Sequence, residues 1–321
     1  MSVREERSPA TDHPWGGAER VVASLTGSSP GTTLLVVGGL HGNEPAGLVA
    51  GRRVVEHLKR TDPELRGSLV VMTGNRQALA KNRRYLDRDM NRRWAGQHLE
   101  RLKTRHHHEL SREDREQLTL AALFEQIVDE TSGDVLYLDL HSTSGEAHPF
   151  AVIIENEGNQ AAADALSVPV IVDLDVFIDS PSMTWFVERG ITALGIEGGV
   201  HDGAETIDHL ERTIWESLVF AGCLDEIPAS VTVERCDAHD GEARTFRVRY
   251  RQAVVPGMGF DMAPGFPSFR RVSEGEVLAS NKTGPIRAPL SGHIFLPRYQ
   301  DQGEDGFFLL TVEDDQDQPS P

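Results

Sequence analysis

Residues 33–47 read TLLVVGGLHGNEPAG and join a predicted strand to a predicted helix. The apolar run at the start is typical of a strand that is buried on both faces, and the glycines and Pro45 fit a tight corner into a helix. His41 and Glu44 follow this run, at a place where neither can be solvated like an ordinary surface residue. The stretch therefore predicts a strand-to-helix unit that carries two polar side chains to one edge of a sheet.

Apolar strand-like runs alternate with helical segments through the first two-thirds of the chain. The predicted strands cover residues 33–40, 68–74, 134–140, 150–155, 168–173 and 192–199. The predicted helices cover residues 45–60, 112–130, 158–166, 181–189 and 203–222. Because the strand runs are almost continuously apolar, they predict an α/β fold with a mostly parallel or mixed sheet and helices on both faces.

The pattern changes after residue 228. Short strand-like runs separated by Gly, Pro and acidic turns follow, with no convincing helix between them. We therefore predict two domains: residues 1–228 form the catalytic α/β domain, and residues 229–321 form a small all-β domain. The polar N-terminal head and the acidic C-terminal tail are expected to be disordered.

Charge and composition exclude several classes of function. The 321-residue chain has a formal net charge of −18, which disfavours nucleic acid as a partner, because a binder needs a basic patch to neutralise phosphates. The sequence contains no apolar run of membrane-spanning length, and its N-terminus lacks the apolar middle of a secretory signal. We expect a cytoplasmic protein with a small-molecule partner; the sequence leaves the oligomeric state open, a homo-oligomer included.

Three predicted strand ends carry polar residues that could meet at one rim of the sheet. His41 and Glu44 follow the first, His141 lies in LDLHSTSG, and Glu197 lies in GIEGG. Ligands in open α/β sheets collect beyond the carboxyl ends of the strands. Two histidines and one carboxylate, with a fourth position left to water, form the ligand set of a catalytic zinc site. Zinc polarises a carbonyl and lowers the pKa of water, while a carboxylate outside the ligand set, here Glu197, can carry the proton.

Each of these motifs also has a purely structural interpretation. A His-x-x-Glu pair can occur by chance at any helix start, and a single strand-end histidine more often has a structural role. Three such strand ends together favour the metal site. The run HHH at residues 106–108 lies in a charged segment and predicts solvated helix surface, and His201 is more often structural than a part of the cleft.

A second group of candidates lies in NRRYLDRDMNRRW, residues 82–94. Most such runs are exposed loops whose charges are solvated or paired with one another. Arg84, Asn91 and Arg92, however, lie close to aromatic residues, and arginine forks bind carboxylates in a bidentate manner. This loop could therefore bind a substrate carboxylate beside the metal.

Four motifs in this order, GGLHGNEPAG, GNRQALAKNRRYLDRDMNRRW, DLHSTSG and GIEGG, resemble those of the succinylglutamate desuccinylase/aspartoacylase family. That family is related to the zinc carboxypeptidases, and the resemblance covers about residues 32–300. It implies a zinc-carboxypeptidase-like mixed sheet. It also implies one Zn²⁺ per chain, with His41, Glu44 and His141 as the ligands.

The resemblance also implies roles for other residues. Glu197 looks like the general base and acid that activates water and protonates the leaving amine. Arg84 stands where the family has an arginine that polarises the scissile carbonyl and stabilises the oxyanion. Asn91 and Arg92 match the pair that binds the α-carboxylate of the amino acid, and Asp89 looks like a support for this substrate-binding loop.

The sequence differs from the family at the position expected to bind the acyl group of the substrate. Aspartoacylases have an arginine ten residues before the catalytic glutamate, which holds the acyl-side carboxylate, and here that position is Val187. Arg189 is two residues further on and is expected to face another side. The C-terminal region is similar to bacterial members with a barrel-sandwich-like β domain. We expect it to cover the site and to bring Arg298 or Tyr299 within reach of the substrate.

The sequence thus predicts a zinc-dependent amidohydrolase that removes an acyl group, such as succinyl or acetyl, from an amino acid. Two alternatives stay open. One is a carboxypeptidase-like metallopeptidase, which needs a more open groove than a covered site provides. The other is a catalytically silent metal-binding module.

Overall fold

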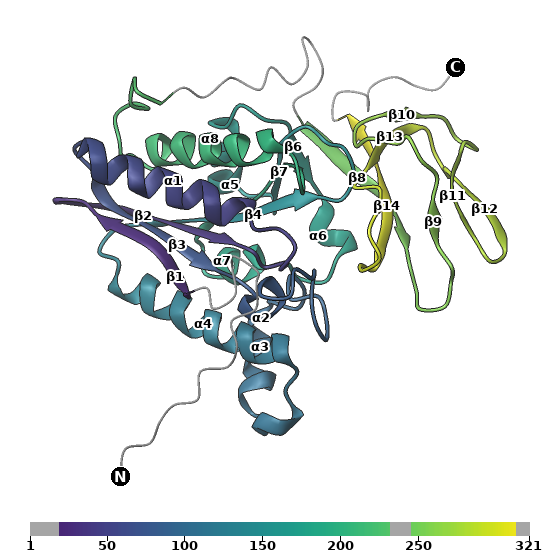
Figure 1. The fold of residues 1–321 in the computed structure, drawn as a ribbon, viewed down its shortest axis with the longest axis horizontal. Coiled ribbons are helices and arrows are strands. Elements are labelled where there is room, and N and C mark those ends of the chain that lie inside the picture. The colour runs from purple at the N-terminus through teal and green to yellow at the C-terminus, as the bar shows by residue number, and fades with distance from the viewer. Residues whose placement is uncertain (1–18, 232–244, 313–321) are drawn as a thin grey trace.

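The computed structural model describes residues 19–231 and 245–312 (Figure 1). The head and the acidic tail, both expected to be disordered, lie outside these residues. Most of the first strand-like run after residue 228 also lies outside them. No helix in the described part of the chain combines the length and the apolar character that crossing a membrane requires.

A mixed sheet forms the centre of the α/β part. Its strands are β1 (Val21–Thr26), β2 (Ser29–Gly38), β3 (Arg66–Thr73), β4 (Val135–Thr143), β5 (Phe150–Ile153), β6 (Val170–Val172) and β7 (Thr192–Val200). In space their order is β1-β3-β2-β4-β7-β5-β6. Strands β3, β2, β4 and β7 are mutually parallel, whereas β1 and β5 run antiparallel to β3 and β7. The predicted mixed sheet is confirmed, and every strand predicted in this part is present.

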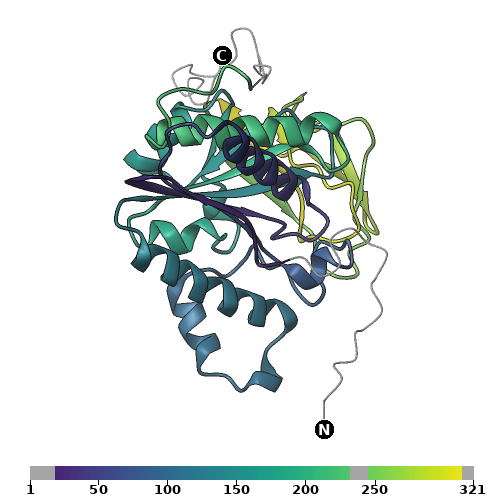
Figure 2. The ribbon, with the colours of Figure 1, turned by 60° about the vertical axis from the view of Figure 1, so that its left-hand side comes forward.

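Helices cover both faces of this sheet (Figures 1 and 2). They are α1 (Ala46–Thr61), α2 (Arg76–Leu79), α3 (Gly96–Lys103), the 3-10 helix η1 (His107–Glu109), α4 (Arg112–Glu130), α5 (Glu157–Asp164), α6 (Leu174–Phe177), α7 (Met183–Val187) and α8 (Ala204–Phe220). One hydrophobic cluster packs α1, α5 and α8 on one face, with Trp215 fully buried in it. A second cluster packs α4 and α7 on the other face around Phe124 and Phe186.

The C-terminal residues extend the same sheet. Their strands are β8 (Thr245–Ala253), β9 (Asp261–Met262), β10 (Arg271–Val272), β11 (Val277–Asn281), β12 (Gly284–Arg287), β13 (Gly292–Phe295) and β14 (Asp305–Val312). Strand β8 pairs parallel with β6 and antiparallel with β14, so the sheet continues as β6-β8-β14-β13-β10. Strands β12, β11 and β9 form a separate antiparallel sheet. The expected β character of residues 245–312 is confirmed. One continuous sheet includes strands on both sides of residue 228, and the domain boundary there stays a prediction.

The corner between β2 and α1 leaves no room for a side chain at Gly42. A Cβ atom there would lie 2.1 Å from the carbonyl carbon of Ala78 and 2.2 Å from the nitrogen of Leu79. Since backbone atoms cannot move aside as a flexible side chain can, only glycine fits at position 42, between His41 and Asn43. The position of His41 therefore depends on this close approach of two backbone segments.

The change Gly42→Ala is expected to lower the free energy of unfolding by about 2–3 kcal/mol, the upper range for overpacking, and to weaken metal binding. Urea unfolding and the zinc content of the purified protein measure the two effects. Gly96→Ala is the matched control, because a Cβ at Gly96 would meet only the side-chain oxygen of Glu188, at 3.2 Å. Equal stability and zinc content in both variants would contradict the proposed constraint.

Candidate metal centre and active-site cavity

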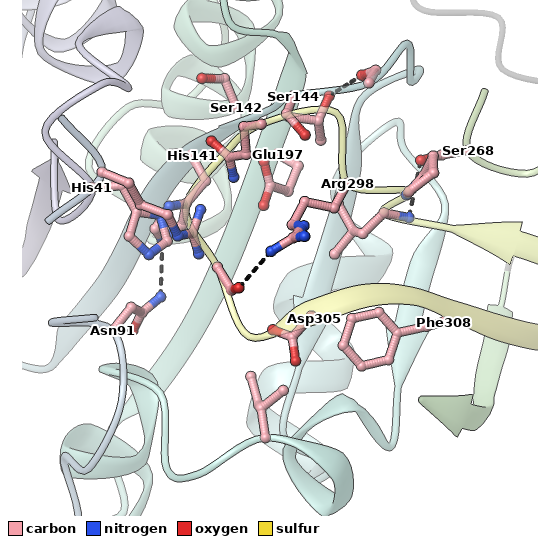
Figure 3. Close-up of a pocket in the computed structure, with 18 of the residues that line it drawn as sticks. His41, Asn91, His141, Ser142, Ser144, Glu197, Ser268, Arg298, Asp305 and Phe308 are labelled. Atoms are coloured by element: carbon pink, nitrogen blue, oxygen red, sulfur yellow. Dashed lines mark hydrogen bonds between the residues drawn. The ribbon is translucent and has the colours of Figure 1, made fainter. Parts of the chain in front are cut away.

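The ends of β2, β4 and β7 lie side by side and bring the predicted residues together (Figure 3). His41 and Glu44 lie in the corner between β2 and α1, and His141 lies near the end of β4. In the pairing of β4 with β7, His141 is the direct partner of Glu197. Parallel pairing in this register places the two side chains about one strand spacing apart.

Glu44 connects the two histidines. Its Oε1 atom lies 3.0 Å from His41 Nδ1, and its Oε2 atom lies 2.8 Å from His141 Nδ1. All three side chains are buried, with Glu44 only 1% exposed. Their candidate ligand atoms lie within 4.8 Å of one another, and they form the only such group of three or more His, Cys, Asp or Glu found among the described residues.

Each histidine also contacts a second carboxylate through its other ring nitrogen, Nε2. His41 Nε2 lies 3.1 Å from Asp89 Oδ1, and His141 Nε2 lies 2.9 Å from Asp139 Oδ2. A carboxylate on the far ring nitrogen fixes the tautomer and the orientation of a metal-binding imidazole. Both Nδ1 atoms therefore face Glu44, and the donor set fits a tetrahedral Zn²⁺ with one open position.

Asp139 is a functional candidate that sequence reasoning missed. It lies two residues before His141 on β4, so both side chains point to the same face of the strand. Its Oδ2 atom also accepts a hydrogen bond from Ser182 Oγ at 2.6 Å. The Asp-x-His spacing on a predicted strand was the signal that could have identified it.

The electrostatics of the cluster favour a positive charge at its centre. Burial alone would raise the pKa of Glu44, but His41 and His141 hold it well below its usual range. Burial alone would lower the pKa of His141, but Asp139 and Glu44 raise it well above its usual range. The carboxylates thus stabilise added positive charge, which a proton supplies in the metal-free protein and a metal cation can supply instead.

Glu197 faces the cavity beside this cluster. Burial raises its pKa to about 8, and the lowering effect of His141 is opposed by the nearby Glu44 carboxylate. Its Oε2 atom is buried and has no hydrogen-bond partner among the residues that the structure describes. A buried carboxyl oxygen without a partner is costly in a structural role, so this atom is free to act on a bound molecule.

The raised pKa of Glu197 predicts a pH-dependent cost in the metal-free protein. Between the ordinary value near 4.5 and the folded value of about 8, the folded state keeps a proton that the unfolded state has lost. The free energy of unfolding should therefore fall as the pH rises through this window, by at most several kcal/mol at about 1.4 kcal/mol per pKa unit. Urea unfolding after chelation should show a steeper fall in the wild type than in Glu197→Gln. Parallel profiles for the two proteins would contradict the raised pKa.

The arginine loop pairs its charges within the site rather than at an exposed surface. Arg84 Nη2 lies 3.1 Å from Asp89 Oδ2, and Arg84 Nη1 lies 3.4 Å from Glu44 Oε1. Burial alone would lower the pKa of Arg84, but Asp89 and Glu44 raise it, so the guanidinium stays charged. These contacts hold Arg84 in a fixed place beside the candidate metal position.

Asn91 and Arg92 both have protein partners already. Asn91 donates to Asp139 Oδ2 at 3.2 Å and accepts from the backbone N–H of Ser182 at 2.7 Å. Arg92 Nη2 donates to Asp305 Oδ2 on β14 at 2.7 Å. Their predicted role in binding an α-carboxylate stays a prediction.

The cavity beside the candidate metal cluster, called the main cavity below, has a volume of about 120 Å³ and is lined from both parts of the chain. The α/β part contributes His41, Arg84, Asn91, Arg92, His141 and Glu197, and the C-terminal part contributes Ser268, Leu296, Pro297, Arg298, Gln300, Gly303, Asp305 and Phe308. The C-terminal residues thus form one wall of the site, as expected for a cover. Tyr299 lies outside the lining, because its hydroxyl donates to the carbonyl of Ala263 at 2.8 Å.

A smaller side cavity of about 60 Å³ shares Asn91, His141, Leu174, Ile178 and Glu197 with the main cavity. Most of its remaining lining is apolar: Val152, Ile153, Ile154, Pro181, Met183 and Ile196. Val187 packs against the hydrophobic cluster under α7 instead. The Arg189 guanidinium stacks on Trp185 at 3.9 Å and lines neither cavity, as the sequence predicts.

The other histidines noted in the sequence lie outside the cavity. The HHH run at residues 106–108 is exposed at η1, as predicted. His201 lies one layer behind the metal cluster, where its Nδ1 atom contacts Ser142 Oγ at 2.8 Å. Its neighbour Ser142 donates its backbone N–H to Glu44 Oε2 at 3.3 Å. His201 therefore contacts the cluster only through Ser142 and does not line the cavity.

Similarity to known proteins agrees with this site. Residues 30–212 match the sequence profile of the succinylglutamate desuccinylase/aspartoacylase catalytic domain. The succinylglutamate desuccinylase of Erwinia tasmaniensis is 43% identical over 63 residues, which are 20% of this chain and 19% of that protein. The corresponding enzyme of Pseudomonas fluorescens strain Pf0-1 is 34% identical over 68 residues, 21% of this chain and 20% of that protein. The chain thus matches about a fifth of the length of these curated relatives.

Solved structures share the fold over most of the chain. A succinylglutamate desuccinylase/aspartoacylase from Rhodobacter sphaeroides is 18% identical, with a TM-score of 0.66 over 91% of this chain and 88% of that one. The product-bound ectoine utilization protein EutE (DoeB) of Ruegeria pomeroyi is also 18% identical, with a TM-score of 0.64 over 90% of this chain and 87% of that one. The profile match covers more than half of the chain and includes every candidate metal ligand, so the chain belongs to the succinylglutamate desuccinylase/aspartoacylase family.

Proposed function

We propose that the protein is a zinc-dependent amidohydrolase that hydrolyses the amide of an N-acyl amino acid, such as a succinyl- or acetyl-amino acid. The observation that carries this proposal is the convergence of two histidine Nδ1 atoms on the buried Glu44, beside the unpartnered Oε2 atom of Glu197. Family membership supports the same reaction class.

The proposed ligands of one Zn²⁺ are His41, Glu44 and His141, with Asp89 and Asp139 orienting the two imidazoles. When bound, the ion supplies a Lewis acid that polarises a carbonyl and lowers the pKa of water. The role of the protein is to hold three donors and leave one position open to the cavity.

Glu197 is proposed to move the proton in this reaction. Hydrolysis joins the oxygen of water to the carbonyl carbon and breaks the C–N bond, so one proton must pass from water to the leaving nitrogen. A carboxyl group whose pKa lies near neutrality can accept and return that proton. The value of about 8 is that of the metal-free cluster, and a cation held next to the carboxylate lowers it toward a base that is ionised at neutral pH.

Arg84 is proposed to stabilise the negative charge that develops on the carbonyl oxygen. Its guanidinium is held by Asp89 and Glu44 before any substrate binds. A donor that is fixed in advance stabilises the transition state without reorganising during the reaction. Asn91 and Arg92 remain the proposed ligands of the α-carboxylate, with Asp89 as their support.

The size of the cavity favours small amides over peptides. Its volume of about 120 Å³ suits a small molecule, and a wall from the C-terminal region stands where a peptidase of this class needs an open groove. A catalytically silent module is less well supported, because each proposed catalytic side chain is present and faces the metal position. The fold does not select the acyl group, because structures of this shape include both desuccinylases and an ectoine utilization protein.

An activity screen tests the proposal. The zinc-loaded protein should release free amine from members of a panel that combines acetyl and succinyl groups with several amino acids, and should leave dipeptides nearly intact. Metal analysis should give about one zinc per chain, and activity should disappear on chelation and return with zinc. Preferred cleavage of peptides would favour the peptidase. Zinc binding without turnover of any panel member would favour the silent module.

A further inference from the structure

The three arginines that line the main cavity differ in how their charges are paired. Arg84 is paired with Asp89 and Glu44, and Arg92 is paired with Asp305. Arg298 has no carboxylate within ion-pair distance among the residues that the structure describes. Arg298 is therefore the lining arginine whose charge is left for a ligand.

The position of Arg298 is fixed by its neighbours in the C-terminal wall. Its backbone N–H donates to the carbonyl of Gly306 at 2.9 Å. The next residue, Tyr299, donates hydrogen bonds to Ser144 Oγ and to the carbonyl of Ala263. The side chain donates once, from Nη1 to the carbonyl of Gly303 at 2.8 Å. In the view of Figure 3 its guanidinium lies between Glu197 and Asp305.

Part of this guanidinium lacks a partner. The Nε atom is buried and makes no hydrogen bond within residues 19–231 and 245–312. The carbon at the centre of the group lies 5.0 Å from the centre of the Phe260 ring. Burial lowers the pKa of Arg298, and the nearby acidic groups do not make up for the lost hydration. A bound carboxylate would satisfy the free donors and replace that hydration.

Asp305 does not neutralise this charge. Its two oxygens are taken by Arg92 Nη2 at 2.7 Å and by Arg251 Nε at 2.6 Å. Both oxygens of Asp305 are therefore occupied by other arginines, and the charge of Arg298 stays available for an anionic ligand.

The side cavity offers no alternative place for such a group. None of the described residues that line it is Arg or Lys, and its acidic lining residues are Asp139, Asp175 and Glu197. A substrate carboxylate would be repelled there and would lose its hydration among apolar side chains. The anionic end of a substrate consequently belongs in the main cavity.

We propose that Arg298 binds a carboxylate of the substrate and so selects N-acyl amino acids that present this group to the C-terminal wall. This role rests on the proposed function and adds a specificity residue from the β region, separate from the Asn91–Arg92 pair.

The test compares substrates that differ only in charge. An N-acetyl amino acid is paired with its carboxamide, and an N-succinyl amino acid is paired with its succinamoyl analogue. The wild type should prefer the carboxylate in at least one pair. Arg298→Met should lower kcat/KM for that carboxylate about 10–100-fold, as expected for the loss of a charge-assisted contact, and change its carboxamide by less than about threefold. Arg298→Lys should recover part of the preference.

Arg270→Met is the matched control, because the Arg270 guanidinium also stacks on an aromatic ring, at 4.1 Å from Phe266, but lines neither cavity. It should keep the wild-type ratio of carboxylate to carboxamide. An unchanged ratio in Arg298→Met, or an equal loss for both members of each pair, would overturn the proposed role.

Binding measurements separate this inference from the proposed function. Calorimetry on zinc-loaded Glu197→Gln follows the same ligands without turnover, with and without Arg298→Met. If the wild type hydrolyses nothing but carboxylate binding depends on Arg298, the proposed function is wrong and the carboxylate site stands. If the wild type hydrolyses the substrates and neither hydrolysis nor binding depends on Arg298, the carboxylate site is wrong and the proposed function stands. No binding of any carboxylate ligand would remove the site.

Discussion

Glu197→Gln is expected to lower kcat for amide hydrolysis by about 100- to 10,000-fold while the chain keeps its zinc, the range that loss of a general acid–base group typically causes. Glutamine has the same size but cannot accept or return a proton. Glu197 is not in the group of candidate ligands, so the metal site should stay intact. Steady-state kinetics and metal analysis of the same protein sample measure the two quantities together.

The control for this variant is Glu205→Gln, an exposed change in the first turn of α8. It removes one negative charge from the same part of the chain and should leave both kcat and zinc content at wild-type values. Wild-type turnover in Glu197→Gln with its zinc present would show that another group carries the proton. Loss of zinc in that variant would show that Glu197 is a ligand.

Glu44→Gln is expected to weaken zinc binding by more than about 100-fold, beyond the 10- to 100-fold range for loss of a supporting residue, and to abolish turnover at ordinary zinc concentrations. Both oxygens of Glu44 face imidazole Nδ1 atoms, and the side chain is 1% exposed. A neutral amide removes the negative charge and turns an N–H group toward these ring nitrogens or toward the cation. Competition with a chelator of known affinity measures the change.

Two further variants show whether the effect is specific to the metal site. Asp139→Asn should weaken zinc binding by about 10–100-fold, less than Glu44→Gln, because it removes the support of His141 and no ligand. Glu56→Gln, an exposed change on α1, should have no effect. Urea unfolding in metal-free buffer shows that each variant is folded. Unchanged zinc affinity in folded Glu44→Gln would refute the assigned ligand set.

The central strands and the long helices were predictable from sequence because they depend on local patterns. Runs such as residues 33–40 and 134–140 are apolar in the way that a strand covered on both faces requires. Strand β1, with only partly buried residues, and the short helices α2 and α6 were missed, because they bury too little apolar surface to leave a pattern. Helix α3 was missed as well, in a charged segment where only Leu99 and Leu102 are buried.

The candidate ligands could be named from sequence because each lies at the end of a recognisable strand or in a motif shared with a known family. His41, His141 and Glu197 need only parallel neighbouring strands to meet at one edge, and the order β2-β4-β7 provides this. The contact of Asp139 with His141 was harder to predict, since an Asp-x-His pair indicates a supporting role only when that face of the strand is known to line the site.

Sequence alone thus determined the α/β pattern, the family resemblance and the residues that can hold a metal, because these depend on local order and on motif identity. Only the tertiary structure decided that β8 joins β6, that Asp305 binds Arg92 across 213 residues, and that Arg298 rather than Tyr299 lines the cavity, with no carboxylate paired to it among the described residues. Such contacts form between segments far apart in the chain, and they depend on the packing of the whole sheet rather than on any local pattern. The corner at residues 38–45 depends on both: the sequence identifies His41 and Glu44 as candidate ligands, and the fold brings His141 next to them.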